Sequence, residues 1–211
     1  MKSFKPKNKE YEEKYASYPD TQEELIQYLE NTLKINYEKL KSEEERIKSI
    51  KMIEKEYTFY LIPKGTPRPR SSRGHFYVKG AKQMKKIFDQ CLKDEGIIYT
   101  RCEYDIDAYM PTPMSSMSNV EILLAEKGLI LPMTTPDFDN LAKTYTDALQ
   151  DVILLNDNVI NPGRVKKYYS IKPRIKIKLR YQSEFDSNYN RRKTMQSIAY
   201  KRLIEGSEGN G

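Results

Sequence analysis

Two aspartates stand two residues apart after Pro136, just ahead of a stretch with the apolar spacing of a helix. Asp137 and Asp139 project from the same side of an extended segment, so their carboxylates can converge. Asp139 is also a natural N-cap for the helix. A third carboxylate, Asp157, follows the helix, and a short return of the chain would bring it back to the first two. The sequence therefore predicts a group of three carboxylates.

Such a group points to metal chemistry. Three neighbouring carboxylates repel and raise one another's pKa unless a cation neutralises them. Mg²⁺ suits the site because it takes hard oxygen ligands and leaves positions open for a phosphate and an attacking water. Lys143, one turn beyond Asp139, would hold the phosphodiester or stabilise the leaving oxygen. The short motif by itself also fits a plain helix start, because Asp and Asn are common N-caps.

Positive charge is concentrated in two segments of the chain. Residues 61–86 hold eight Lys and Arg and no acid, and residues 161–181 hold eight more, again with no acid. The rest of the chain carries more acidic than basic residues, although the net charge is +7. This distribution favours a polyanion such as DNA as partner, since each neutralised phosphate releases a counterion. The alternative is a pair of Lys-rich solvated faces, although such faces usually mix both signs.

The composition excludes several classes of protein. With one His and two Cys, the chain cannot build a Cys₂His₂ finger, a two-His metal site or a disulfide framework. No apolar run approaches the roughly 18 residues needed to span a bilayer, and the first residues lack the apolar stretch of a signal peptide. We expect a soluble, cytoplasmic protein with no membrane partner, whose chemistry rests on carboxylates and lysines.

The elements that must position these residues fall into three parts. Residues 1–56 read as a helical N-terminal extension, with capping boxes that begin at Thr21 and Ser42. Residues 57–181 alternate strand and helix patterns and form the core. Residues 182–211 read as a polar C-terminal tail that is partly disordered. The fold class is α+β, a small mixed sheet with helices packed on it.

The core segment has its own pattern of elements. Strands are predicted where apolar and polar residues alternate and helices where apolar residues recur every three or four positions. The predicted strands are 57–62, 98–110, 164–171 and 174–181, and the predicted helices are 82–92, 118–127 and the stretch after Asp139.

The motif PDFDNLAK at 136–143, with DAL at 147–149 and NDNV at 156–159, resembles the signature of the RusA family of Holliday junction resolvases. The Pro- and Arg-containing segment 65–70 looks like that family's basic N-terminal loop. The resemblance covers roughly residues 57–181. It implies a RusA-like fold, a homodimer and Mg²⁺-dependent cutting of four-way DNA junctions, with Mn²⁺ as a substitute and a phage-type recombination gene as the source. Two symmetric cuts need two active sites, which a twofold dimer supplies.

Carried over by position, the resemblance assigns the metal-binding aspartates to Asp137, Asp139 and Asp157 and the essential lysine to Lys143. Two positions depart from the family pattern: Asn156 replaces a further acid, and Pro136 replaces a basic residue. The basic segments add the DNA-binding candidates, which are Arg68, Arg70, Arg73, Lys79, Lys166, Lys167, Lys176 and Lys178.

We therefore interpret the chain as a Mg²⁺-dependent, structure-selective endonuclease that resolves Holliday junctions or related branched DNA. One alternative is a metal-dependent nuclease for flaps and forks, and another is a junction-binding protein whose acidic residues are structural. Asp147, Asp107, Asp105 and His75 are weaker site candidates, each with a plain explanation as an exposed helix, strand or loop residue.

Overall fold

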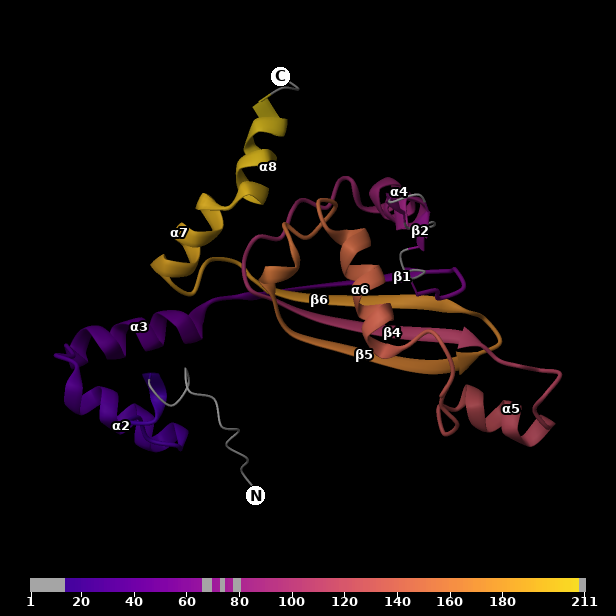
Figure 1. Ribbon diagram of the computed structural model, residues 1–211, viewed down its shortest axis with the longest axis horizontal. Helices are drawn as coiled ribbons and strands as arrows, with labels where there is room; N and C mark the ends of the chain where they lie inside the picture. The colour runs from indigo at the N-terminus through magenta and orange to yellow at the C-terminus, as the bar shows by residue number, and fades with distance from the viewer. Residues whose placement is uncertain (1–13, 66–69, 73–74, 78–80, 209–211) are drawn as a thin grey trace. The chain divides into compact units, whose positions relative to one another are not determined.

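A computed structural model describes residues 14–65, 70–72, 75–77 and 81–208 of the chain (Figure 1). The chain divides into two compact units, residues 1–49 and 50–211. The predicted boundary at residue 56 is too late, because residues 52–56 already belong to the first strand of the second unit. None of the helices in the described ranges is long and apolar enough to cross a membrane.

The first unit contains helices α2 (Gln22–Thr32) and α3 (Tyr37–Ser49). Thr21 caps α2 as predicted, since its hydroxyl accepts a hydrogen bond from the Glu24 amide at 3.3 Å. Helix α3 begins before the predicted Ser42, because the Asn36 side chain accepts a hydrogen bond from the Lys39 amide at 3.0 Å and caps the helix there.

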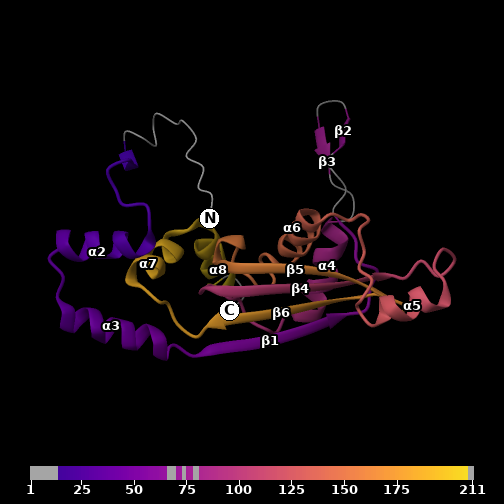
Figure 2. The same ribbon diagram turned by 90° about the horizontal axis from the view of Figure 1, so that it is seen from below.

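The second unit is built on a four-stranded mixed sheet in the order β1-β6-β4-β5, which Figure 2 shows from bottom to top. The strands are β1 (Met52–Phe59), β4 (Cys102–Pro111), β5 (Ile160–Ser170) and β6 (Arg174–Gln182). Strand β6 pairs antiparallel with both β1 and β4, whereas β4 and β5 are parallel. The predicted α+β fold class, with a mixed sheet and an N-terminal helical part, is confirmed.

The parallel pairing of β4 and β5 requires a crossover connection. That connection contains α5 (Asn119–Glu126) and α6 (Phe138–Leu149). Helix α5 starts with a complete capping box, in which the Ser118 side chain and the Glu121 side chain each accept the other residue's amide. Helix α6 buries an apolar stripe on the sheet and therefore fixes where its first turn lies.

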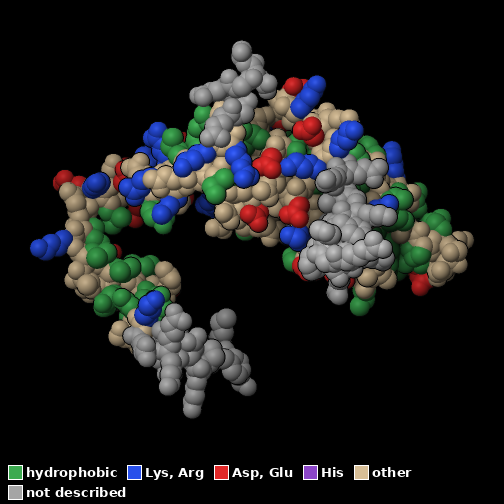
Figure 3. Space-filling view, turned by 45° about the horizontal axis from the view of Figure 1, so that its top comes forward, with side chains coloured by type: hydrophobic (Ala, Val, Ile, Leu, Met, Phe, Trp, Pro, Cys, Tyr) green, Lys and Arg blue, Asp and Glu red, His purple; other side chains and the backbone are tan. Residues whose placement is uncertain are grey.

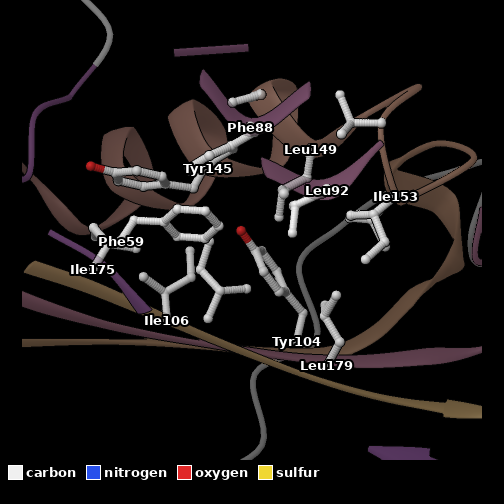
Figure 4. Close-up of a cluster of buried hydrophobic side chains, with 14 of the residues drawn as sticks. Phe59, Phe88, Leu92, Tyr104, Ile106, Tyr145, Leu149, Ile153, Ile175 and Leu179 are labelled. Atoms are coloured by element: carbon white, nitrogen blue, oxygen red, sulfur yellow. The ribbon is translucent and has the colours of Figure 1, made fainter. Parts of the chain in front are cut away.

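The core lies between one face of the sheet and helices α6 and α4 (Ala81–Leu92). Along β4 every second side chain is buried, as the alternation predicts, and Ile106 is fully inaccessible. Figure 4 shows Phe88 and Tyr145 of the two helices above Ile106 and Ile175 of the sheet. The Phe88 ring lies 4.4 Å from the Phe59 ring and 6.1 Å from the Tyr145 ring, measured between centroids.

The C-terminal segment differs from the predicted polar tail, because it forms helices α7 (Asn188–Gln196) and α8 (Ile198–Glu208). Ser187 caps α7 by accepting a hydrogen bond from the Asn190 amide at 3.2 Å. Apolar side chains of α8, namely Ala199, Tyr200 and Leu203, pack against the core. A few apolar contacts thus order a segment whose composition is mostly polar.

A short hairpin of β2 (Arg70–Ser72) and β3 (His75–Tyr77) follows the Pro-containing segment. Of the DNA-binding candidates, Arg68, Arg73 and Lys79 lie outside the described residues. The backbone of Arg70 forms the first position of β2, opposite Tyr77.

We expect Ile106→Ala to destabilise the protein by about 2–5 kcal/mol, because it removes apolar volume at a fully buried position and leaves a cavity. Ile171→Ala is the matched control, since Ile171 is 66% exposed and its truncation should change stability by less than about 0.5 kcal/mol. Urea unfolding of the two variants beside the wild type checks the difference. Equal midpoints for the two variants would contradict the assignment of the core.

Candidate active site

The two aspartates of the motif lie at the start of α6, and both are exposed. The structure places Asp137, not the predicted Asp139, at the N-cap, and the Asp137 carboxylate makes no capping hydrogen bond. Asp139 lies in the first turn of the helix. Both carboxylates therefore sit at the end of the helix where its dipole favours negative charge, and the Asp137 oxygens are not used to cap the helix.

A close backbone approach holds the segment before the basic hairpin against this motif. A Cβ added to Gly65 would lie 2.5 Å from the side-chain nitrogen (Nδ2) of Asn140 and 2.9 Å from Cβ of Pro136. Only glycine allows the chain to pass so near. The Pro- and Arg-containing segment 65–70 therefore starts beside the two aspartates.

A buried tyrosine of α6 also anchors the chain just before Gly65. The Lys64 amide donates a hydrogen bond to the Tyr145 hydroxyl at 3.3 Å, and Tyr145 is fully buried in α6. Burial raises the pKa of Tyr145 to about 12, while the hydrogen bond from Lys64 opposes the rise. The phenol remains protonated at neutral pH, so this anchor does not change with pH in the physiological range.

A lysine from β5 supports the loop that leads into the motif. The Lys167 ammonium donates to the carbonyl oxygens of Thr134 and Pro136, at 2.8 and 3.2 Å. In the register of the sheet Lys167 pairs with Ala108, whose side chain is buried beneath the helices. This predicted DNA-binding residue thus contacts the backbone just before Asp137.

The predicted catalytic lysine lies on the exposed surface of α6. The Lys143 ammonium is 3.4 Å from a carboxylate oxygen of Asp147, one turn further along, and both side chains are largely exposed. Asp139, Lys143 and Asp147 are spaced four residues apart and therefore follow one face of the helix. Asp147 belongs to that face as the partner of the lysine.

The third predicted carboxylate lies far from the first two. Asp157 is exposed at the start of a short 3₁₀ helix (Asp157–Val159), directly before β5. The loop before Asp137 is held by Lys167, seven residues beyond the first residue of β5, which corresponds to a rise of about 23 Å along the strand. Mg²⁺ binds its ligands at about 2.1 Å, so one ion cannot join both ends of the strand.

Consistently, within the described part of the chain no three His, Cys, Asp or Glu residues come together in a group that could hold a metal ion. The prediction that Asp137, Asp139 and Asp157 meet within one chain is therefore wrong for this structure. The physical reason is the crossover between parallel strands, which starts at one end of β5 and finishes at the other.

The remaining basic candidates lie on the sheet face opposite the helices. Lys178 pairs with Glu54 at 2.8 Å and Lys176 with Glu56 at 3.7 Å, both across the β1–β6 ladder. Lys166 lies opposite Asp107 in the parallel ladder. Burial raises the pKa of Asp107, while Lys166 and Arg164 oppose the rise. Acids of neighbouring strands therefore neutralise much of the charge of the basic strands.

Neighbouring side chains complete this sheet face. Arg180 contacts both Glu54 and Glu103, and Arg164 forms an ion pair with Asp105. The Arg174 guanidinium lies 3.7 Å above the Tyr109 ring, which stacks on the Tyr168 ring at 5.1 Å. On the opposite side of the unit, which carries the helices, Figure 3 also shows Lys and Arg side chains scattered among acidic ones. The segment-by-segment charge count missed these pairs because the acids come from other strands.

Comparison with known proteins identifies the class of protein to which this fold and site belong. The family model described as "Endodeoxyribonuclease RusA" matches residues 61–180. The chain belongs to this family of Holliday junction resolvases and is thus an endodeoxyribonuclease by family, as the resemblance implied. It is also similar to the Bacillus subtilis (strain 168) protein named "Uncharacterized protein YqaN", with 34% identity over 134 residues, which cover 59% of this chain and 94% of that protein.

We expect Gly65→Ala to lower the rate of DNA cleavage by about 10- to 100-fold, because the added methyl must displace Asn140 or the segment that carries the basic residues. Gly163→Ala is the matched control, since its Cβ would meet Ile160 at an ordinary 3.4 Å. Single-turnover cleavage, with thermal melting as the measure of folding, checks the outcome. Wild-type rates for Gly65→Ala would show that this close approach does not position the site.

Proposed function

We propose that this chain is a Mg²⁺-dependent, structure-selective endonuclease that resolves Holliday junctions or related branched DNA by paired phosphodiester cuts. The observation that carries the proposal is the pair of exposed carboxylates at the start of α6, one turn from an exposed lysine. The Lys167 ammonium holds the loop that leads into these carboxylates. The Tyr145 hydroxyl anchors the chain at Lys64, and Gly65 lies against the motif.

The side chains at the start of α6 fit a hard divalent ion. Asp137 and Asp139 offer carboxylate oxygens, the ligands that Mg²⁺ takes in proteins. Mg²⁺ bound there would stabilise negative charge on the scissile phosphate and lower the pKa of the attacking water. Lys143 would present its ammonium to the phosphodiester or the leaving oxygen, and Asp147 would restrain the lysine when no DNA is bound.

The third carboxylate comes from a second copy of the chain in our proposal. Asp157 lies too far along β5 to join Asp137 and Asp139 of its own chain. In a twofold dimer, the partner's Asp157 can approach Asp137 and Asp139 of one protomer, and the symmetric arrangement forms a second site. A dimer of this kind has two complete sites, which matches the two cuts that resolve a four-way junction.

An exposed apolar surface beside the aspartates supports self-association. Between α5 and the first turn of α6 the chain exposes six large apolar side chains, by 51% to 96%: Val120, Leu123, Leu129, Leu131, Met133 and Phe138. Phe138 lies between the two aspartates in the sequence. Exposed apolar side chains that gather in one segment of the chain favour an interaction surface. A contact made there would bring a second protomer to the catalytic segment.

We expect Asp139→Asn to lower Mg²⁺-dependent cleavage of a mobile four-way junction by about a hundredfold or more, because it removes a charged ligand. Junction affinity should hold or rise, since the substitution removes negative charge near the phosphates. Asp137→Asn and Asp157→Asn should behave alike, and Asp89→Asn, an exposed acid on α4, is the matched control. Cleavage and gel-shift titrations on a junction, a flap and linear duplex measure both quantities.

Equal cutting by Asp139→Asn and wild type would refute the site assignment. Faster cutting of the flap than of the junction would favour the alternative nuclease. A wild type that binds junctions and never cuts with Mg²⁺ or Mn²⁺ would favour the non-catalytic alternative.

Mixing two inactive variants tests the shared site. In a mixed dimer of Asp139→Asn and Asp157→Asn, both substitutions fall in one site and the other site is complete. Equal mixing with subunit exchange makes half of the dimers mixed, so about a quarter of the wild-type sites should be active, as single nicks. If all three carboxylates came from one chain, each site of the mixed dimer would carry one substitution and no activity would return. Mixing Asp139→Asn with Asp137→Asn is the negative control.

A further inference from the structure

A cavity of about 370 Å³ lies between the sheet and the C-terminal segment of the second unit. Its wall on the core side includes Tyr99 and Asn158, and its opposite wall includes Phe185, Asn190 and Lys193. The second wall lies beyond residue 180, where the match to the family model ends. The family match therefore covers only part of this cavity, and its volume falls in the usual range of about 300–1,000 Å³ for small-ligand sites.

One side of the cavity is aromatic. The rings of Tyr99 and Phe185 lie 5.8 Å apart between centroids, inclined by 35°, and Tyr99 is 41% exposed. The edge of Tyr99 also meets the Tyr200 ring of α8 at 6.2 Å, which fixes its orientation. Fixed aromatic faces that are open to solvent can stack on nucleobases of any sequence.

A buried side-chain oxygen without a hydrogen-bond donor among the described residues belongs to a residue of the cavity lining, Gln182. Gln182 is 5% exposed, and its side-chain oxygen accepts no hydrogen bond from the residues that the structure describes. Its backbone is satisfied, since its amide donates to the Arg101 carbonyl at 3.0 Å and its carbonyl accepts from the Thr100 hydroxyl at 2.5 Å. Leaving a buried acceptor without a donor is unfavourable. Because this oxygen is screened from solvent, a ligand N–H group, such as the exocyclic amine of a base, would satisfy it after the Gln182 side chain turns toward the cavity.

The cavity adjoins the third carboxylate and carries positive charge. Asn156 and Asn158, the residues on either side of Asp157, both line it. Arg101 and Lys193 also line it and are substantially exposed. The acid Asp186 lines it as well, and Arg101 lies 3.8 Å from Glu103, so the cavity lining itself carries a small excess of positive charge. The Arg101 side chain is held by a hydrogen bond to the Asn161 carbonyl at 3.2 Å. Stacking faces, an unused acceptor and two cations together match one nucleotide of a DNA strand.

We propose that this cavity receives one unpaired nucleobase of the branched DNA bound at Asp157, stacked on Tyr99 and Phe185 and hydrogen bonded to Gln182. The inference rests on the proposed function. Bases at a branch point are easier to extrude than bases inside a regular duplex, because less pairing and stacking is lost. The pocket thus selects a base beside the cut and contributes to the recognition of branched DNA.

Abasic substitution combined with Phe185→Ala tests the inference. Junctions with one abasic site at each position near the crossover are titrated without divalent ion, which prevents cutting. For the wild type, one position should lower affinity by about tenfold when its base is missing, as stacking predicts. Phe185→Ala should bind the intact junction about tenfold more weakly and lose nothing further at that one position. Tyr37→Ala, an exposed aromatic of α3 outside the cavity lining, is the matched control and should bind like the wild type.

Gln182→Leu supplies an independent readout if Phe185→Ala fails to fold. The wild type should bind a junction with an amino-bearing base at the critical position more tightly than one with the analogue that lacks the amine, and Gln182→Leu should not discriminate. The inference is overturned if the affinity lost by abasic substitution adds to that lost by Phe185→Ala at every position. It is also overturned if Phe185→Ala binds like the wild type. In either case the nuclease proposal stands. A wild type that does not bind branched DNA overturns both the base-pocket inference and the nuclease proposal. A wild type that still cuts branched DNA with divalent ion shows that only the base-pocket inference has failed.

Discussion

The parallel pairing of β4 and β5 is the constraint on which the site depends. Because the two strands point the same way, the chain must cross from the end of one to the start of the other. The crossover delivers Asp137 and Asp139 to one end of β5 and Asp157 to the other. No local adjustment of a loop reunites these carboxylates, since their separation is set by the length of a hydrogen-bonded strand. This separation is the reason for our proposal that the site is shared between two copies of the chain.

The basic strands illustrate how tertiary structure redistributes charge. Each of β5 and β6 carries positive side chains that, in the sequence, have no acid near them. In the sheet, Glu54 and Glu56 of β1 form diagonal ion pairs with Lys178 and Lys176 of β6, and Asp105 of β4 pairs with Arg164 of β5. Exposed ion pairs of this kind contribute little stability, so DNA phosphates can compete for the lysines. The face is therefore less attractive to DNA than its strands suggest, without being closed to it.

Much of the fold follows from periodicity. The alternation in β4 and β6 and the apolar stripe of α6 each specified an element and the face that it buries. The site motif was also visible, because its residues are contiguous. The order of the strands in the sheet could not be predicted from the sequence. The acids that pair with the basic strands and the position of Asp157 were therefore not predictable either. The helices α7 and α8 were missed because their few apolar residues stand in a polar segment.

The outermost strands of the sheet carry a consequence for how the protein meets other copies of itself. Strand β1 is lined with Glu54, Lys55 and Glu56, and strand β5 contains Pro162, which has no amide hydrogen to donate. Charge and proline at such margins discourage continuous sheets from forming between molecules. Assembly through strand addition is thereby disfavoured on both sides. Association between copies of the chain would then rely on side-chain contacts elsewhere on the surface. Such contacts can form a closed dimer instead of an open-ended fibre.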